Sequence, residues 1–189
     1  MRWWRWILVA VLAAIVGFVL MRGLERLVRE PSGGEEVSHL VPGAPLRTVQ
    51  IFFGAKDRVG FVTEERAIAD PPSLEKLAEE IVRQLLEGST EGITGLPPST
   101  RLRAFYIAED GVAYLDLSSD LLLNWPVGDG LEWVTLGSLV RSLTENIPTL
   151  RAVQIMIDGH MVARSPGSIP LDLPLDPEWF GATSVEVMR

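Results

Sequence analysis

The stretch LGSLVRSLTENIPTLRAVQIMIDGH, residues 136–160, contains the change from helical to strand periodicity that decides the fold. Its first half continues an apolar stripe at helical spacing, made of Trp133, Leu136, Val140, Leu143 and Ile147. This spacing predicts a helix from about Glu132 to Ile147, which Pro148 ends. The strand Ala152–Ile157 follows, and the turn Asp158-Gly159 joins it to a second strand over His160–Ala163.

The residues before this stretch repeat the same alternation of strand and helix. The pairs Thr48–Phe53 with Phe61–Ile68, and Arg101–Ala108 with Val112–Leu117, read as hairpins. Between them lies a helix that starts after Ser73 and stops at Gly88. The order ββα-ββα-ββ predicts an α+β fold, a mixed sheet with two helices packed on it. The predicted core includes Ile51, Ile81, Leu85, Leu115, Leu143 and Ile155.

A membrane anchor is predicted for residues 1–30. The apolar run WILVAVLAAIVGFVLM, residues 6–21, is flanked by arginines and approaches the length of one transmembrane helix when Trp3 and Trp4 are added. A cleaved signal peptide is the alternative, but residues 21–25, MRGLE, offer no small-residue cleavage site. The chain has no cysteine, which excludes a lipid-modified cysteine and thiolate chemistry.

Residues 31–46 are rich in Gly, Pro and Glu and predict a flexible stalk before one domain, residues 47–189. Residues 31–189 carry 12 basic and 23 acidic side chains, a net charge of −11. Such a balance argues against nucleic acid as a partner. An acidic domain behind a single anchor is expected on the outer side of the cytoplasmic membrane, as part of a single-pass protein.

Two segments, GITGLPPSTRLRAFYIAEDGVAYLDLSSDL at 92–121 and residues 136–160, resemble the sporulation and spore germination domain known as GerMN. The matching positions are Gly95, Leu96, Pro97, Ser99 and Thr100; Ala113 to Ser118; Ser138 to Glu145; and Val153 to Gly159. The resemblance extends from Val49 to about Leu175. It implies an envelope accessory domain that brings no catalytic residues and no cofactor. Members often carry two copies and many are lipoproteins, whereas this chain has one copy and an apolar N-terminal run.

Catalytic and metal-binding motifs are sparse. The two histidines are His39, in the stalk, and His160, beside a turn, where a solvated histidine is the favoured interpretation over a member of a triad. Ser73 to Lys76 matches the S-x-x-K pattern of serine enzymes, but a helix cap followed by an exposed lysine explains it better. Asp116, Ser118 and Asp120 have the spacing of a calcium loop without its later ligands, and a strand end with a short helical turn is favoured.

Tryptophans are the remaining candidates for recognition. Trp133 lies on the helical stripe, Trp179 lies near the C-terminus, and Trp125 lies in a loop where it could bind a ligand or cover the core. Two functions follow. The first is a non-catalytic, membrane-anchored scaffold or adaptor that binds envelope proteins. The alternative is a module that binds peptidoglycan or another glycan, or a cryptic cell-wall hydrolase. A surface patch without a cleft favours the first, and a groove lined by Trp125 and carboxylates favours the second.

Overall fold

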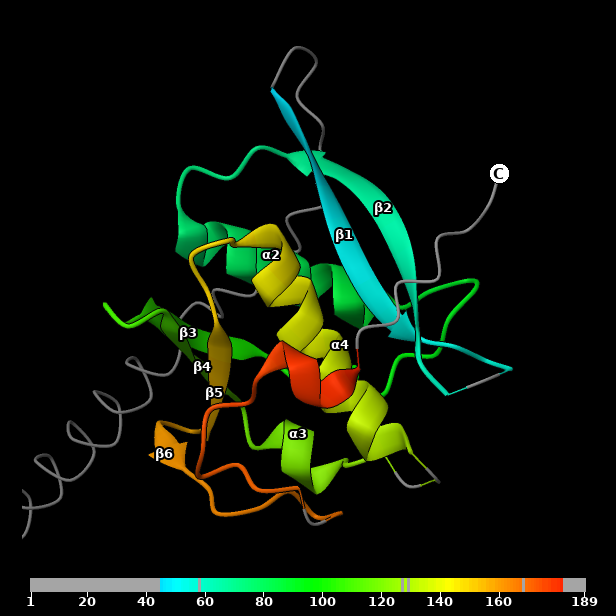
Figure 1. The fold of residues 1–189 in the computed structure, drawn as a ribbon, viewed down its shortest axis with the longest axis vertical. Helices are drawn as coiled ribbons and strands as arrows, with labels where there is room; N and C mark the ends of the chain where they lie inside the picture. Colours follow the sequence, from blue (N-terminus) through cyan, green and yellow to red (C-terminus); the bar gives the residue numbers. More distant parts are fainter. Residues whose placement is uncertain (1–44, 58, 127, 129, 168, 182–189) are drawn as a thin grey trace, which may run out of the picture. The chain divides into compact units, whose positions relative to one another are not determined.

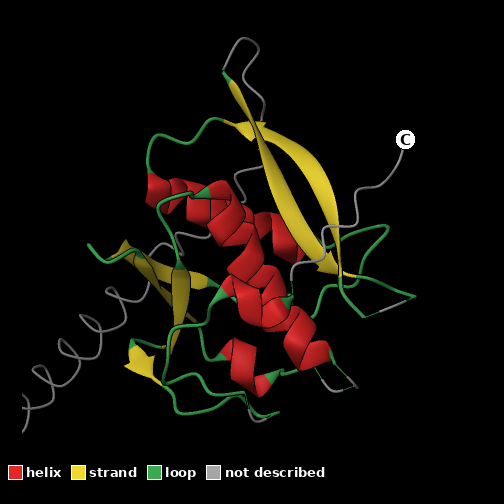
Figure 2. Ribbon diagram, in the orientation of Figure 1, coloured by secondary structure: helices red, strands yellow, loops and turns green. Residues whose placement is uncertain are grey.

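The computed structural model describes residues 45–57, 59–126, 128, 130–167 and 169–181. Helix α4 (Leu131–Asn146) contacts strands of two separate β-sheets, the helix α2 (Leu74–Glu87) and the short 3-10 helix η1 (Pro177–Phe180) (Figure 1). The mixture of helices and strands, red and yellow in Figure 2, confirms the predicted α+β class.

One sheet is the hairpin of β1 (Leu46–Gly54) and β2 (Phe61–Ala69). The other has the strand order β3-β4-β5-β6. Its strands are β3 (Leu102–Ile107), β4 (Val112–Leu117), β5 (Ala152–Ile157) and β6 (His160–Met161). β4 and β5 are parallel, whereas the other neighbours are antiparallel. A short helix, α3 (Asp120–Leu123), follows β4, as expected for the predicted helical turn.

The prediction of one mixed sheet is wrong, because the six strands form two sheets. The cause lies at the edge of β1 that faces α4. There Asn146 accepts a hydrogen bond from the Gln50 N–H (2.9 Å) and donates one to the Gln50 carbonyl (2.7 Å). Ser142 Oγ accepts from the Phe52 N–H at 2.9 Å. These side chains of α4 take the place of a neighbouring strand, so β1 cannot pair with the second sheet through these groups.

Burial is more extensive than the periodicity predicted. β1 was expected to bury one face, but Phe52 on the opposite face is only 2% exposed because the Arg141 guanidinium covers its ring. Likewise, residues 135–143 of α4 are all buried, beyond the predicted stripe, because the helix has packing partners on several sides. The six predicted core residues are all fully buried, which confirms the assigned faces.

Two smaller differences concern the ends of the domain. The last hairpin strand, predicted to reach Ala163, ends at Met161. The 3-10 helix η1 was not predicted.

The predicted anchor, residues 1–30, and the stalk up to residue 44 lie outside the described residues, and β1 already begins at Leu46. Within the part of the chain that is described, no helix has the length and apolarity to cross a membrane.

Replacing Asn146 by Ala should lower the free energy of unfolding by about 2 to 4 kcal/mol, because two backbone groups of Gln50 lose their partners. Urea denaturation of the full chain in detergent micelles measures this change. The matched control is Glu145→Ala at the exposed neighbouring position, with an expected change below about 0.5 kcal/mol. Equal effects of the two substitutions would show that the Asn146 contacts do not hold β1.

Gly137 lies in the buried middle of α4, where a methyl group would collide with the Phe61 ring and lie 2.8 Å from Phe180 Cδ1. Gly137→Ala should therefore destabilise the protein by about 1 to 3 kcal/mol, although alanine favours an isolated helix by about 1 kcal/mol. The direction of the change in stability therefore shows whether the steric clash or the helix propensity dominates. A higher denaturation midpoint for Gly137→Ala would mean that the two rings are not packed against this helix.

Candidate functional site

Two tyrosines stand side by side on the outer face of the four-stranded sheet. Tyr106 on β3 and Tyr114 on β4 are register partners, and their ring centroids are 6.4 Å apart. Their neighbours Phe105 and Leu115 point into the core, so alternation turns both tyrosines outward. Tyr106 is 62% exposed and Tyr114 is 36% exposed. Tyrosine is enriched at interfaces, and two exposed rings that lie together form a patch rather than scattered residues, so this pair marks a candidate contact surface.

Two methionines lie on the same side of the sheet as the tyrosines. Met156 of β5 pairs with Asp116 of β4 in parallel register, and Met161 of β6 pairs with Met156. Register partners share a face, so both methionines lie on the side of the tyrosines. Met161 is 56% exposed. We call Tyr106, Tyr114, Met156 and Met161 the tyrosine face.

An ion cluster borders the tyrosine face. Arg103 pairs with Asp116 at 3.3 Å and also with Asp158. Asp116 accepts a hydrogen bond from the Gly159 N–H at 2.8 Å, which ties β4 to the turn after β5. Asp158 adopts a left-handed backbone conformation, φ 49°, which asparagine and aspartate tolerate better than most residues. The cluster therefore fixes the turn that the sequence predicted at Asp158-Gly159.

Contacts with Ser119 and Arg103 determine the charge state of the Asp158 carboxyl. A hydrogen bond from Ser119 lowers the pKa of the Asp158 carboxyl below its ordinary value, and the neighbouring Arg103 lowers the pKa further. The carboxylate is therefore ionised at neutral pH and belongs to an exposed ion pair, whose contribution to stability is small.

The candidate calcium residues make other contacts. Asp116 is held by Arg103 and Gly159, and Ser118 donates to Asp120 at 3.0 Å while accepting from the Arg101 N–H at 3.1 Å. No group of three or more His, Cys, Asp or Glu residues suited to a metal occurs among the residues described. The favoured interpretation, a strand end followed by a helical turn, is what the structure has.

The described residues with catalytic potential do not converge. His39 lies outside the described residues, and the exposed His160 has its Nδ1 2.8 Å from the carbonyl oxygen of Asp158 in its own turn. Ser73 accepts from the Lys76 N–H at 3.3 Å, which confirms the helix cap, and Lys76 pairs with Glu79. A catalytic triad would require a nucleophile, a base and an orienting group in mutual contact, and no described side chain forms such a contact with His160.

The carboxyl groups with a clear pKa shift, Glu75, Glu80 and Asp158, all have a lowered pKa, whereas a general acid of a glycosidase requires a raised one. A hydrogen bond to Ser73 lowers the pKa of Glu75. Burial of Glu80 opposes its ionisation, but hydrogen bonds from Arg83 and Gln84 outweigh this and lower its pKa. The carboxylates that come together do so around an arginine. Asp116 and Asp158 share Arg103 on the sheet surface, and Glu80 and Glu87 likewise share Arg83 on α2.

The three tryptophans of the described residues occupy different environments. Trp133 stacks on Phe61 with centroids 4.6 Å apart, as expected for a core position. Trp125, which was predicted either to bind a ligand or to cover the core, is half-buried and packs against the core. Trp179, on η1, is 53% exposed. The tryptophans do not gather in one groove, and sequence reasoning overlooked the two tyrosines in favour of them.

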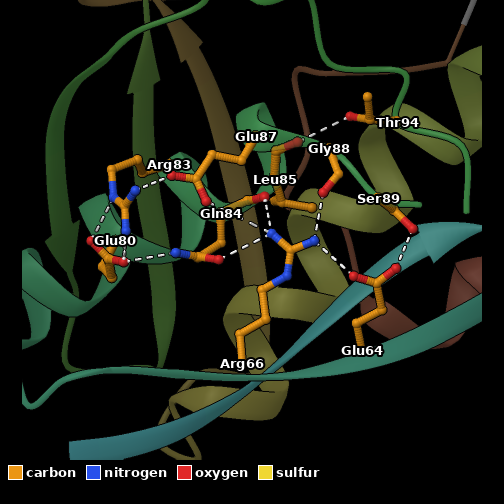
Figure 3. Close-up of polar contacts among 10 residues, drawn as sticks. All are labelled: Glu64, Arg66, Glu80, Arg83, Gln84, Leu85, Glu87, Gly88, Ser89 and Thr94. Carbon is orange, nitrogen blue, oxygen red and sulfur yellow. Dashed lines mark hydrogen bonds and ion pairs between the residues drawn. The ribbon is translucent and has the colours of Figure 1, made fainter. Parts of the chain in front are cut away.

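A second polar cluster, also missed from the sequence, joins β2 to the end of α2 (Figure 3). Arg66 donates to the carbonyls of Gln84 (2.8 Å) and Gly88, to the Gln84 side chain (3.0 Å) and to Glu64 (2.7 Å). Its guanidinium also lies 5.0 Å from the centre of the Phe53 ring. Because Arg66 satisfies carbonyls at the C-terminal end of α2, the cluster has a structural role as a helix cap.

The comparisons with known proteins agree with the fold. A model of the family Germane, described as sporulation and spore germination, matches residues 50–163. The chain belongs to the Germane family. This match confirms the predicted resemblance to GerMN domains, and it includes both the tyrosine face and the ion cluster. None of the curated proteins compared with the chain is a match.

Solved structures share the fold. A candidate lipoprotein of Clostridium perfringens is 26% identical, with a TM-score of 0.50, over 73% of this chain and 91% of that one. The first GerMN domain of the sporulation protein GerM from Bacillus subtilis is 19% identical, with a TM-score of 0.54, over 70% of this chain and 98% of that one. The tandem GerMN domains of GerM have a TM-score of 0.59 at 18% identity over 71% of this chain, which covers 47% of their length.

The charge state of Asp158 gives a pH prediction. A folded-state pKa below the unfolded value means that the ion pairs stabilise the fold above the ordinary pKa, and that this contribution is lost as pH falls through the folded pKa. An NMR titration of the carboxyl carbon should give a pKa below 3.8. Ser119→Ala and Arg103→Gln should each raise it. If the pKa of Asp158 were the same in both variants as in the unchanged protein, its contacts with Ser119 and Arg103 would be contradicted.

Proposed function

We propose that this Germane-family chain is a membrane-anchored, non-catalytic domain of the cell envelope, which acts as a scaffold or adaptor of sporulation- or germination-type machinery. The observation that carries the proposal is the tyrosine face, an aromatic and thioether surface of the sheet on which Tyr106, Tyr114 and Met161 are exposed. Aromatic residues and methionine are enriched in protein interfaces. Binding an envelope protein would remove both rings from water.

Tethering the domain to the membrane would make such a small surface sufficient to hold a partner. The tyrosine face is small, so we expect its affinity for a free partner to be weak. An anchor at residues 1–30 would confine the domain and its partner to one membrane. Such confinement raises the effective concentration toward the millimolar range, where weak contacts hold a complex. The name of the Clostridium relative, a candidate lipoprotein, is consistent with an envelope location for this chain.

The topology predicts the result of surface proteolysis. Protease added to intact spheroplasts should remove the domain and leave a short membrane stub, because residues 31–189 are proposed to lie outside the cytoplasmic membrane. Lysed spheroplasts and a cytoplasmic marker protein serve as controls. Full protection of the domain, or a mature N-terminus after Gly23, would contradict an uncleaved anchor with an external domain.

The contact function predicts that the tyrosine face can be removed without unfolding the protein. The double substitution Tyr106→Ala and Tyr114→Ala should leave the midpoint of thermal unfolding within a few degrees of that of the unchanged protein, because both side chains are exposed. The same pair should abolish recovery of the partner from crosslinked membranes. The matched control is Glu75→Ala with Glu79→Ala on the exposed side of α2, which should leave recovery unchanged.

The glycan-binding alternative gives a different pattern in the same variants. Aromatic rings also stack on sugars, so sedimentation of the full chain with purified peptidoglycan tests this alternative, with Trp125→Ala as a third variant. Co-sedimentation that Trp125→Ala or the tyrosine pair removes would favour the glycan module. Release of peptidoglycan fragments that the pair His160→Ala and Asp116→Asn stops would overturn the non-catalytic proposal.

A further inference from the structure

Arg141 forms part of the wall of an open pocket of about 320 Å³, beside the C-terminal half of α4. Leu150 and Pro177 also line the pocket, together with the carboxylates of Glu145 on α4 and Glu178 on η1. The site is separate from the tyrosine face, since none of the four residues of that face lines it. Its volume lies at the lower end of the range for small-molecule sites.

Arg141 is a buried cation that forms no ion pair within 4.0 Å with a carboxylate of the described residues. The residue is only 9% exposed, and its guanidinium lies 4.6 Å from the centre of the Phe52 ring and 5.4 Å from that of Phe61. It donates a hydrogen bond to the Gly181 carbonyl. Across the described ranges, no carboxylate oxygen lies within 4.0 Å of it. Buried charges in proteins are usually paired, so this arginine has unused capacity for an anion.

The environment also fixes the orientation of the cation. Contacts with two aromatic rings hold the guanidinium in one place and offset part of the cost of burying it. Burial lowers the pKa of Arg141, and the nearby Glu145 partly offsets this effect. The group nevertheless stays protonated at neutral pH, because the pKa of arginine is so high. It therefore presents a fixed positive charge with planar donors, which suits a carboxylate.

The other charges of the pocket restrict what can bind. One arginine and two glutamates give the lining a net charge of −1. A simple anion would be repelled by Glu145 and Glu178, and a simple cation would be repelled by Arg141. A ligand with one carboxylate and a nearby ammonium group satisfies both signs, and a second ammonium group matches the net charge. Leu150 and Pro177 offer apolar surface for an aliphatic chain between these groups.

We propose that this pocket binds a basic amino acid with a free carboxylate, either as a free molecule or as the C-terminal residue of a peptide. In this arrangement the ligand carboxylate contacts Arg141, and the ammonium group of its side chain contacts Glu145 and Glu178. The inference goes beyond the proposed scaffold function and does not depend on it, since binding would occur with or without a protein partner on the tyrosine face.

Binding of lysine and its analogues to the full chain in detergent micelles tests the proposal. L-lysine and D-lysine carry all the charged groups, cadaverine lacks the carboxylate, and Nα,Nε-diacetyl-lysine lacks both ammonium groups. We expect saturable binding of at least one lysine enantiomer by calorimetry. Cadaverine and the diacetyl compound should bind at least about tenfold more weakly, because each loses a charge-assisted contact.

Nα-acetyl-lysine distinguishes the two sources of the ligand. It keeps the carboxylate and the side-chain ammonium group but mimics a residue that is joined to a peptide. Binding as tight as that of lysine would assign the site to a peptide C-terminus. A loss of at least about tenfold would assign it to the free amino acid. Either result supports the pocket as a site for a basic residue with a free carboxylate.

Two variants keep the proposal falsifiable if Arg141→Gln does not fold. Glu178 is an exposed residue of η1, and Glu178→Gln should weaken lysine binding at least about fivefold with an unchanged thermal midpoint. The control Glu109→Gln, in the turn between β3 and β4, should leave binding unchanged. The proposal is overturned if no lysine form binds at about 10 mM, if cadaverine binds as tightly as lysine, or if both variants weaken binding equally.

Discussion

The pairing of the Asn146 side chain with the backbone of Gln50 is the contact on which the rest of the fold depends. A strand edge exposes N–H and C=O groups that need partners. Here a helix supplies them through Asn146 and, one turn earlier, Ser142. As a result β1 and β2 remain a separate hairpin, and α4 lies between that hairpin and the four-stranded sheet, in contact with both.

This arrangement determines which surfaces are available for function. The hairpin, α2 and α4 pack together on the inner side, so the outer face of β3 and β4 remains open and presents Tyr106 and Tyr114. On β5 the same face is partly covered, because Gln154 is buried and donates to the Leu171 carbonyl at 2.6 Å. Burial of α4 on several sides also explains Arg141, whose side chain covers Phe52 and reaches the pocket.

Local patterns in the sequence predict most of the elements and little of their assembly. The strand Val112–Leu117 was predicted to the residue, because alternation and the Asp-Gly turn are local signals. The division into two sheets was missed, because it depends on Asn146 contacting a strand 96 residues away. Alternation with the buried Phe105 turns Tyr106 outward in the structure, but no local signal states whether another segment covers it. For the same reason the sequence left open whether Trp125 binds a ligand or covers the core, and in the structure it packs against the core.

Site-specific photocrosslinking in living cells tests the central claim, that the tyrosine face contacts an envelope protein. A photoreactive phenylalanine analogue is placed at Tyr106, and in a matched strain at Glu79, which is exposed on α2. The account predicts a discrete crosslinked product from position 106 that is absent from position 79 and disappears when residues 1–30 are deleted. The absence of a product at position 106, or identical products from both positions, would contradict it.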